Sequence, residues 1–527
     1  MAISGMSSCM WGGLFLVAIT ASAAAQPELQ ELVSIRVSDS KQQYWVEQVV
    51  GGLSYPTSIA WLPNGDVLIA ERQGALRIVR DGRLDPKAIS GVPTSYQGLF
   101  DGMRDIAVDS KYPSTHRIYL YISEGTFELR YAAVYSARLS GGALQDVRRI
   151  FRSKEGVGGG AIGITSRMIL MSDGTLLLAV AEGRELNRAQ QLDSHFGKIL
   201  RINSDGSVPP NNPFINVEGA LPEIYSLGHR VPLGLFEDTS SALLWETEAG
   251  PRGGDELNLI KPASNYGWPK ASWGFSYLNT GAVAPAQTAP DVVAPIVVWT
   301  PSVTPSAITR FRGATYPSWD GDYFVGNLGG EALMRLRIDP AQRLVLQERM
   351  LLDLEVRIRD VKIGPDNHLY LLTDHQSGSL LRIMPGRPSS QQLSSVAKKI
   401  EQPFKFGNDK PSLSQAEIDS LSQDDVAAGH RAFMERCSGC HSIGKAVAGG
   451  GIGPNLDGVY NNFMGRKAGF DYSSNMVGGM IQWNPDMLNK FLENPAGLVP
   501  GTKMASPPVT DGDTRRKIIG FLSRPSQ

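Results

Sequence analysis

Between residues 50 and 385, apolar and polar positions follow one recurring arrangement. An apolar strand leads into a polar turn, a second apolar strand follows, and a third comes after another turn that often contains glycine. The clearest copy is "IAWLPNGDVLIAERQGALRIV" (59–79), and the other copies occupy residues 106–123, 168–183, 235–250, 311–327 and 361–383. Alternation of period two, broken by Asn-Gly, Asp-Gly or Pro-Asp turns, predicts antiparallel strands.

Six copies of this unit predict a six-bladed β-propeller, an all-β fold, over residues 26–385. Repeats of roughly 40–70 residues that each supply an antiparallel sheet are typical of propellers. A single blade cannot bury both of its faces, so we expect the ring of blades to close.

The pattern changes after the last copy. Residues 386–424 are polar, rich in Ser, Gln, Lys and Pro, and weakly periodic, which predicts a linker. Helical periodicity then appears in "SQDDVAAGHRAFMERC", with Ser422 or Asp424 as candidate N-cap, and "DTRRKIIGFLSR" (513–524) predicts a closing helix. Residues 425–527 are therefore predicted to be a small all-α domain.

The N-terminus predicts export. Residues 1–25 contain a short apolar run, residues 11–19, and then the small-residue stretch "ASAAA", in which Ala23-x-Ala25 is a candidate signal-peptide cleavage site. No Lys or Arg precedes the apolar run. The run is too short to span a bilayer, so we expect a signal peptide, no transmembrane segment, and a periplasmic or secreted protein.

Charge and cysteine content narrow the function classes. The net charge of −1 and the apolar content of 42% give no reason to expect nucleic acid or an anionic membrane as a partner. Of three cysteines, Cys9 lies in the predicted signal, so Cys437 and Cys440 are the thiols that remain. Both belong to one motif, which leaves no cysteine for a disulfide.

That motif is "CSGCHSIG" at residues 437–444. Cys-x-x-Cys-His is the attachment motif of c-type haem, in which Cys437 and Cys440 bond covalently to the haem and His441 is an axial ligand of the iron. A thioredoxin-like redox pair would need a βαβ context and would not need the histidine. One covalent haem c is therefore predicted.

The rest of the helical region resembles class I cytochromes c. The matching stretches are "GIGPNL", "DYSSNM", "IQWNP" and "VPGTKM". The resemblance implies that the Pro454 carbonyl orients the axial histidine, that Tyr472 and Trp483 reach a haem propionate, and that Met504 is the distal iron ligand. A thioether opposite an imidazole favours Fe(II), and two strong axial ligands leave no open position for oxygen, so electron transfer is the expected role.

The predicted propeller resembles soluble aldose dehydrogenases that use pyrroloquinoline quinone (PQQ), over roughly residues 45–385. The resemblance is carried by "LGHRVPLGL" (227–235), "ETEAGPRGGDELNLI" (246–260), "NYGWP" (265–269), "AQQLDSHFGKILRINSDGSVPPNNPF" (189–214) and "VRIRDVKIGPDNHLYLLTD" (356–374). It implies a small-molecule sugar substrate and oxidation at a CH–OH group.

The resemblance also implies a cofactor site. Arg230, Arg357 and Arg359 match arginines at PQQ, and planar guanidinium forks suit its three carboxylates and quinone oxygens. Gly250 and Pro251 match positions whose backbone carbonyls hold Ca²⁺, a hard ion that prefers oxygen ligands.

Several positions depart from the pattern of that family. Counting without gaps, the family's general-base His falls at Gly163, its Asp partner at Glu182, a cofactor-binding Lys at Gly329, an Asn at Val231, and a Gln at about Phe100. No histidine lies between residues 117 and 194.

The departures leave three alternatives for the base. Glu182 could itself abstract the proton, His195 or His229 could replace the missing histidine, or the propeller could have weak or no sugar activity.

Three hypotheses for the whole chain follow. The first is an exported quinohaemoprotein that oxidises an aldose or related sugar with PQQ and passes electrons to its own haem and then to a downstream acceptor, a cytochrome or an oxidase. The second is a non-catalytic propeller that docks a redox partner onto the haem domain. The third is a Ca²⁺-dependent hydrolase of the lactonase kind, which a haem argues against because hydrolysis yields no electrons.

Overall fold

The computed structural model describes most of the chain after the predicted signal peptide. The described residues are 34–96, 101–126, 129–158, 163–183, 185–276, 281–390, 392, 413–444, 453–465, 467, 470, 472, 476, 482–499, 502, 504 and 509–524. Within these ranges no helix has the length and apolar content needed to cross a membrane.

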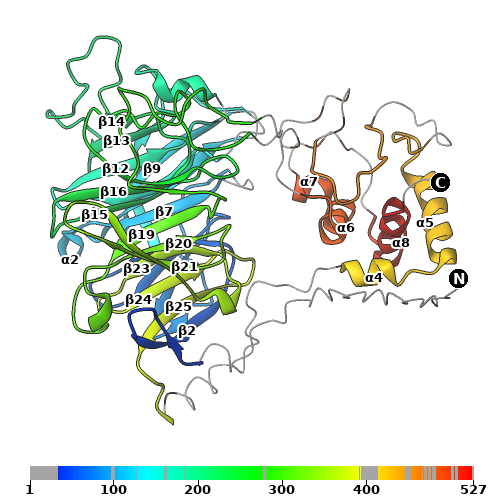
Figure 1. The fold of residues 1–527 in the computed structure, drawn as a ribbon, viewed down its shortest axis with the longest axis horizontal. Helices are drawn as coiled ribbons and strands as arrows, with labels where there is room; N and C mark the ends of the chain where they lie inside the picture. The colour runs from blue at the N-terminus through cyan, green and yellow to red at the C-terminus, as the bar shows by residue number, and fades with distance from the viewer. Residues whose placement is uncertain are drawn as a thin grey trace, which may run out of the picture.

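Six antiparallel sheets make up the N-terminal part of the described structure (Figure 1). Blade 1 consists of β3 (Pro56–Trp61), β4 (Val67–Glu71), β5 (Leu76–Arg80) and β6 (Arg83–Leu84). Blade 2 consists of β7 (Met103–Val108), β8 (Arg117–Gly125), β9 (Arg130–Ser140) and β10 (Ala143–Arg152). Blade 3 consists of β11 (Thr165–Leu170), β12 (Thr175–Val180), β13 (Lys198–Asn203) and β14 (Ile224–Leu227).

Blades 4 to 6 follow the same order. Blade 4 consists of β15 (Pro232–Asp238), β16 (Leu243–Glu248), β17 (Asp255–Leu259) and β18 (Val297–Trp299). Blade 5 consists of β19 (Pro305–Arg310), β20 (Tyr323–Asn327), β21 (Leu333–Ile338) and β22 (Leu344–Met350). Blade 6 consists of β23 (Ile358–Ile363), β24 (Leu369–Thr373), β25 (Gly378–Pro385), β2 (Gln43–Leu53) and β1 (Arg36–Val37). This confirms the predicted six-bladed propeller.

The first strand of each blade lines the centre of the ring. The inner strands β3, β7, β11, β15, β19 and β23 each contact the next, and β23 returns to β3. Both faces of a blade are covered by its neighbours, so its strands are largely buried; the second strands β4, β20 and β24 are buried at every position. The Asn64–Gly65 turn between β3 and β4 uses a positive φ of 91° at Gly65, which glycine adopts without steric cost.

The ring is closed by pairing the two ends of the propeller. β2 lies antiparallel to β25, from Tyr44 opposite Pro385 to Leu53 opposite Gly378. Arg382 on β25 forms an ion pair with Glu47 on β2 at 2.6 Å. Blade 6 therefore takes strands from both ends of the propeller, which the repeat pattern alone did not predict.

Short helical turns connect some of the strands. They are α2 (Tyr112–Thr115), η1 (Leu186–Gln190), η2 (Pro317–Trp319) and η3 (Leu352–Leu354). Of these, η1 follows Glu182 in the connection between β12 and β13.

The C-terminal part is helical, as predicted (Figure 1). Its helices are α4 (Gln415–Asp419), α5 (Gln423–Arg436), α6 (Pro485–Glu493), α7 (Pro495–Leu498) and α8 (Gly512–Leu522). Ser422 is the N-cap of α5 and forms a capping box with Asp425. The predicted closing helix corresponds to α8.

The predicted linker, residues 386–424, extended too far toward the C-terminus. Leu413, Ile418 and Leu421 are buried in the apolar core of the helical domain, and α4 lies within the predicted linker. α4 is only one turn long, so it offers no helical periodicity that the sequence pattern could reveal.

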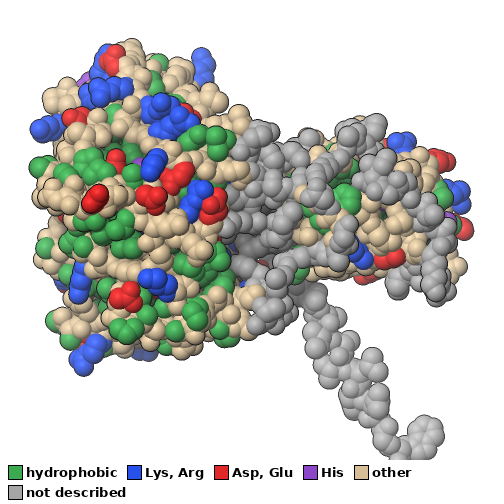
Figure 2. Space-filling view, turned by 90° about the horizontal axis from the view of Figure 1, so that it is seen from above, with side chains coloured by type: hydrophobic (Ala, Val, Ile, Leu, Met, Phe, Trp, Pro, Cys, Tyr) green, Lys and Arg blue, Asp and Glu red, His purple; other side chains and the backbone are tan. Residues whose placement is uncertain are grey.

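The described surface carries both signs of charge. In the space-filling view of Figure 2, Lys and Arg side chains alternate with Asp and Glu over the propeller and over the helical domain. This distribution agrees with the small net charge of the chain.

Candidate functional site

One end of the propeller gathers the polar residues singled out by the sequence. Inner strands begin, and second strands end, at the same edge of an antiparallel sheet. Arg359 is the second residue of β23, Arg230 precedes β15, Glu182 follows β12, and Gly250 follows β16. We call this end of the ring the site end.

Two of the predicted arginines share one carboxylate. Arg357 Nη2 and Arg359 Nη2 lie 3.1 Å and 3.0 Å from Asp374 Oδ2. Arg357 Nη1 also donates to the Leu328 carbonyl at 2.8 Å. Although burial opposes ionisation, Arg359 and Arg357 hold the pKa of Asp374 well below its usual range. Asp374 therefore stays charged and fixes both guanidinium groups.

Arg359 keeps unused hydrogen-bonding capacity. Its side chain is buried, and its Nε has no hydrogen-bond partner in the described structure. Burial lowers the pKa of Arg359, although Asp374 opposes this change. One carboxylate between two guanidinium groups leaves net positive charge, which suits an anionic ligand.

Arg230 lies beside Glu182. The Arg230 carbonyl accepts a hydrogen bond from the Glu182 backbone N–H at 2.9 Å. Its Nη1 donates to the Ala249 carbonyl at 2.7 Å, and its guanidinium carbon lies 5.4 Å from the centroid of Trp268. Both side chains are buried, so the structure brings the predicted cofactor arginine and the predicted base together.

The position at which the resemblance expects a histidine also lies near Glu182. Gly163 is buried, and the carbonyl of the next residue, Ile164, accepts the backbone N–H of Ala181 at 3.1 Å. Glu182 is thus adjacent in space to the place of the missing base.

The two candidate replacement histidines have other contacts. His195 Nδ1 accepts the Lys154 backbone N–H at 3.0 Å, and its ring lies against Phe151 of blade 2. His229 is fully buried, hydrogen-bonds to Ser226 Oγ at 2.8 Å and stacks on Tyr266. These contacts assign both rings a role in packing.

His229 also belongs to a buried acidic cluster. A ring nitrogen of His229 and one carboxylate oxygen each of Glu246 and Glu248 lie within 4.8 Å of one another. Burial, reinforced by the neighbouring Glu248, raises the pKa of Glu246 well above its ordinary value, and burial raises that of Glu248 to about 8. Burial, with Lys198 nearby, lowers the pKa of His229 to about 3.

The predicted calcium loop is held by Asp255. Asp255 Oδ1 accepts the Gly250 backbone N–H at 2.8 Å, and Oδ2 accepts those of Val303 and Thr304 at 2.7 Å each. The Pro251 carbonyl accepts the Phe275 N–H at 2.9 Å and keeps a second lone pair. The loop offers oxygen ligands, the donor type that Ca²⁺ requires.

Arg104 is a fourth arginine at the site end, and sequence reasoning missed it. It is the second residue of β7 and is buried. Burial, with the charges of Arg359 and Arg72, lowers its pKa to about 9. The signal in the sequence was an arginine next to an aspartate within an apolar strand, "MRDIAV".

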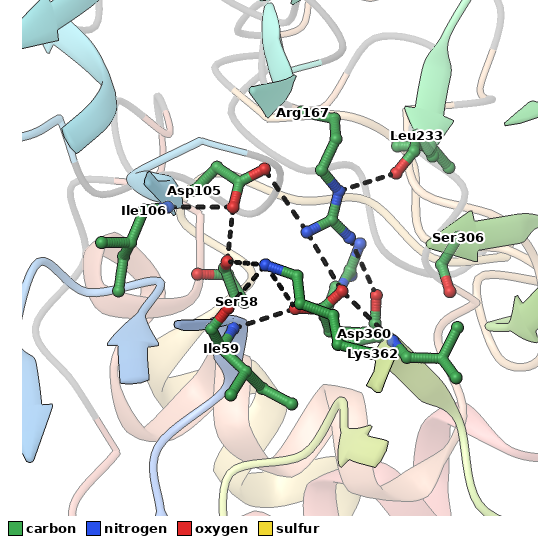
Figure 3. Close-up of polar contacts among 12 residues, drawn as sticks. Ser58, Ile59, Asp105, Ile106, Arg167, Leu233, Ser306, Asp360 and Lys362 are labelled. Atoms are coloured by element: carbon green, nitrogen blue, oxygen red, sulfur yellow. Dashed lines mark hydrogen bonds and ion pairs between the residues drawn. The ribbon is translucent and has the colours of Figure 1, made fainter. Parts of the chain in front are cut away.

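A polar network, which we call the axial network, crosses the centre of the ring (Figure 3). Arg167 of β11 forms ion pairs with Asp105 of β7 at 3.4 Å and Asp360 of β23 at 3.3 Å. Its Nε donates to the Leu233 carbonyl of β15, and its Nη2 to the Arg359 carbonyl, each at 3.3 Å. One side chain thus joins blade 3 to blades 2, 4 and 6.

The two aspartates extend the axial network to blade 1. Asp105 accepts a hydrogen bond from the Ser58 hydroxyl and, at 2.8 Å, from the Met168 N–H. Asp360 Oδ2 accepts the Ile59 N–H at 2.9 Å. Although burial opposes it, Asp360 and Asp105 raise the pKa of Arg167. The network is therefore charged and well satisfied.

The haem motif follows α5 directly. The His441 N–H donates to the Cys437 carbonyl at 2.9 Å, so the turn carries both cysteines and the histidine. His441 Nδ1 donates to the Pro454 carbonyl at 2.8 Å, which leaves Nε2 for a metal. A Cβ on Gly453 would lie 2.5 Å from the imidazole, so this close approach requires glycine.

The other predicted haem residues share one apolar core. Trp483 is buried in it, and Cys437, Tyr472 and Met504 pack against it. Burial raises the pKa of the Cys437 thiol to about 11. A free imidazole Nε2, a thioether and an apolar lining fit a covalent haem.

Comparison with known proteins identifies the propeller. The profile described as Glucose / Sorbosone dehydrogenase matches residues 53–382. The aldose sugar dehydrogenase YliI of Escherichia coli is 34% identical over 348 residues, which are 64% of this chain and 92% of the relative.

Two solved structures resemble the fold. The apo form of a soluble aldose sugar dehydrogenase from Escherichia coli gives a TM-score of 0.62 at 33% identity, covering 65% of this chain and all of that one (100%). The PQQ-bound form of an aldose sugar dehydrogenase from Streptomyces coelicolor gives 0.52 at 26% identity, covering 66% and 100%.

The helical domain matches a different class of protein. Cytochrome c of Stellaria longipes is 38% identical over 102 residues, which are 19% of this chain and 94% of the relative. The chain therefore combines a PQQ dehydrogenase-like propeller with a region homologous to cytochrome c.

Proposed function

Because the chain belongs to the glucose/sorbosone dehydrogenase family, we propose that it is an exported PQQ-dependent sugar dehydrogenase that passes electrons to its own c-type haem. The observation that carries this proposal is the excess of positive charge at the site end, where Arg359 is buried and Arg357 is exposed. Arg357 and Arg359 share one carboxylate, and Arg359 Nε has no partner among described residues. A ligand with several carboxylates would supply the missing negative charge.

The residues of the chain divide the work. Arg230, Arg357 and Arg359 would bind and orient PQQ, and the Gly250 and Pro251 carbonyls would hold Ca²⁺. When bound, PQQ supplies a quinone that accepts the two electrons of sugar oxidation, and the haem accepts electrons one at a time.

Glu182 is the proposed general base. It would take the proton from the sugar hydroxyl, in place of the histidine that Gly163 does not provide. Glu182→Gln preserves size and polarity but removes the basic oxygen. We expect the rate of sugar-dependent reduction to fall by about 10²–10⁴-fold while PQQ still binds. The measurement is the steady-state rate with an aldose and an artificial dye; a rate within a few-fold of the unchanged protein would contradict this role.

Electron transfer through the haem is tested in the full chain. The exported protein is reconstituted with PQQ and Ca²⁺, and haem reduction is followed optically after an aldose is added. Because the haem domain and the propeller belong to one chain, the effective haem concentration should be on the order of millimolar, so the rate of haem reduction should not depend on protein concentration. Cys437→Ala/Cys440→Ala should keep dye reduction and lose reduction of an external cytochrome c; equal cytochrome rates would remove the haem from the electron path.

One observation favours the second candidate, a non-catalytic propeller that docks a redox partner. Gly163 leaves the expected base position without a side chain able to accept a proton. Binding of PQQ without any sugar-dependent haem reduction in the reconstituted protein would support this alternative.

A further inference from the structure

The charge of Arg104 lacks a partner of its own. Arg104 is 7% exposed, and its Nε has no hydrogen-bond partner among the described residues. No ion pair joins Arg104 to a carboxylate in the described part of the chain. Arg167, which is similarly buried, has ion pairs to two aspartates.

The carboxylates nearest to Arg104 are already engaged. Asp374 pairs with Arg357 and Arg359, and Asp101 lies 3.3 Å from Arg130 and accepts the Ser123 hydroxyl. Besides burial, the charges that most lower the pKa of Arg104 are those of Arg359 and Arg72, whereas Asp374 and Asp101 only partly compensate. Arg104 thus lies in a region with an excess of positive charge.

The backbone that carries Arg104 is firmly fixed. The next residue, Asp105, belongs to the axial network, and the preceding Met103 N–H donates to the Arg72 carbonyl at 3.1 Å. Gly102 has a φ of 107°, and a Cβ there would lie 1.8 Å from the Arg72 carbonyl oxygen. β7 therefore cannot easily shift to move the arginine away from its like-charged neighbours.

A buried, unneutralised cation is costly for the folded protein. Its retention on a fixed strand beside Arg359 is explained if a ligand completes the charge balance. We propose that Arg104 is a further cofactor-binding residue, which donates hydrogen bonds to a carboxylate of PQQ together with Arg359. This inference rests on the proposed function of the site end, and it adds a residue from blade 2 to a cofactor site otherwise built from blades 4 and 6.

The test uses the full-length, haem-loaded protein with Ca²⁺. Arg104→Met, Arg104→Lys and the control Arg117→Met are compared by calorimetric titration with PQQ. Arg117 also belongs to blade 2, but it is exposed and bonds to Ser136. We expect Arg104→Met to weaken PQQ binding about tenfold or more, Arg104→Lys to weaken it less, and the control to leave it unchanged. Unchanged affinity in Arg104→Met would overturn the proposal.

Thermal unfolding separates a binding role from a structural one. Without ligand, Arg104→Met should have a Tm equal to or above that of the unchanged protein, because repulsion with Arg359 is removed. A lower Tm in both Arg104 variants, or a failure of both to fold, would assign the residue a structural role and overturn the inference.

A second anion makes the result independent of the quinone. Citrate also carries three carboxylates and should raise the Tm of the unloaded protein more than that of Arg104→Met. If PQQ does not bind the unchanged protein but citrate shows this difference, the proposed function fails and the anion site at Arg104 stands. If neither anion distinguishes the two proteins, the inference fails.

Discussion

The axial network and the site end are built from neighbouring residues but differ in charge balance. Asp105 and Asp360 lie in the axial network, and the residues just before them, Arg104 and Arg359, lie at the site end. Arg167 forms ion pairs with Asp105 and Asp360, which raise its pKa although burial opposes this. Arg104 and Arg359 have excess positive charge around them, and their pKa values are lowered.

The difference shows how one set of strands can hold both a support and a binding site. A satisfied buried ion pair fixes the distance between strands, although it adds little net stability. An unsatisfied cation beside it is destabilising until a ligand arrives. The axial network thus holds β7 and β23 in place, and Arg104 and Arg359, one on each strand, carry positive charge at the site end.

The largest expected effect comes from breaking the axial network. Arg167→Met leaves Asp105 and Asp360 buried without their shared cation. We expect the free energy of unfolding of the propeller to fall by about 3–5 kcal/mol, measured by chemical denaturation. The triple variant Arg167→Met/Asp105→Asn/Asp360→Asn should recover part of this loss, because no buried charge is then left alone. A single variant as stable as the unchanged protein would contradict the ion-pair account.

A smaller effect is expected at the site end, on binding rather than on folding. Arg359→Met should weaken PQQ affinity about tenfold or more while the free energy of unfolding of the unloaded protein changes little. Titration calorimetry measures the first quantity and denaturation the second. If Arg359→Met destabilised the protein as strongly as Arg167→Met, the distinction between site and support would be lost.

The smallest effect concerns the buried acidic cluster, a third way to balance charge. Burial, reinforced by the charges of Glu248 and Glu256, raises the pKa of Glu246 well above its ordinary value of 4.5 and so favours its protonated form in the folded protein. The unfolded chain releases this proton above about pH 4.5, so stability should fall as pH rises from there toward the raised pKa. Glu246→Gln should flatten this pH dependence by about 1 kcal/mol, followed as Tm between pH 5 and 9. An unchanged slope would show that Glu246 is ionised in the folded protein.

The sequence predicted the blades well because strands rich in apolar residues alternate with turns that have a strong signal, such as Asn64–Gly65. It did not predict that β2 completes blade 6, because this pairing joins residues as far apart in sequence as Tyr44 and Pro385 and leaves no local pattern. Helix α4 was missed because a helix of a single turn is too short to show a periodic pattern of apolar residues.

The resemblance pointed to Arg230, Arg357 and Arg359, which the structure places at the same end of the ring. That they bind PQQ stays a prediction. The resemblance expected a lysine at Gly329, next to Leu328, whose carbonyl accepts from Arg357. Arg104 was overlooked because a lone arginine in a strand is usually solvated, and only the fold shows that its strand lines the centre of the ring.

The pairing of β2 with β25 also sets an order of events during synthesis. β2 is made early and β25 more than three hundred residues later, so the ring cannot close before β25 has been made. Until then the edge of β2 that later pairs with β25 is open and can associate with other chains. Contacts this distant in sequence form slowly, so a helper that shields this open edge would reduce association during synthesis.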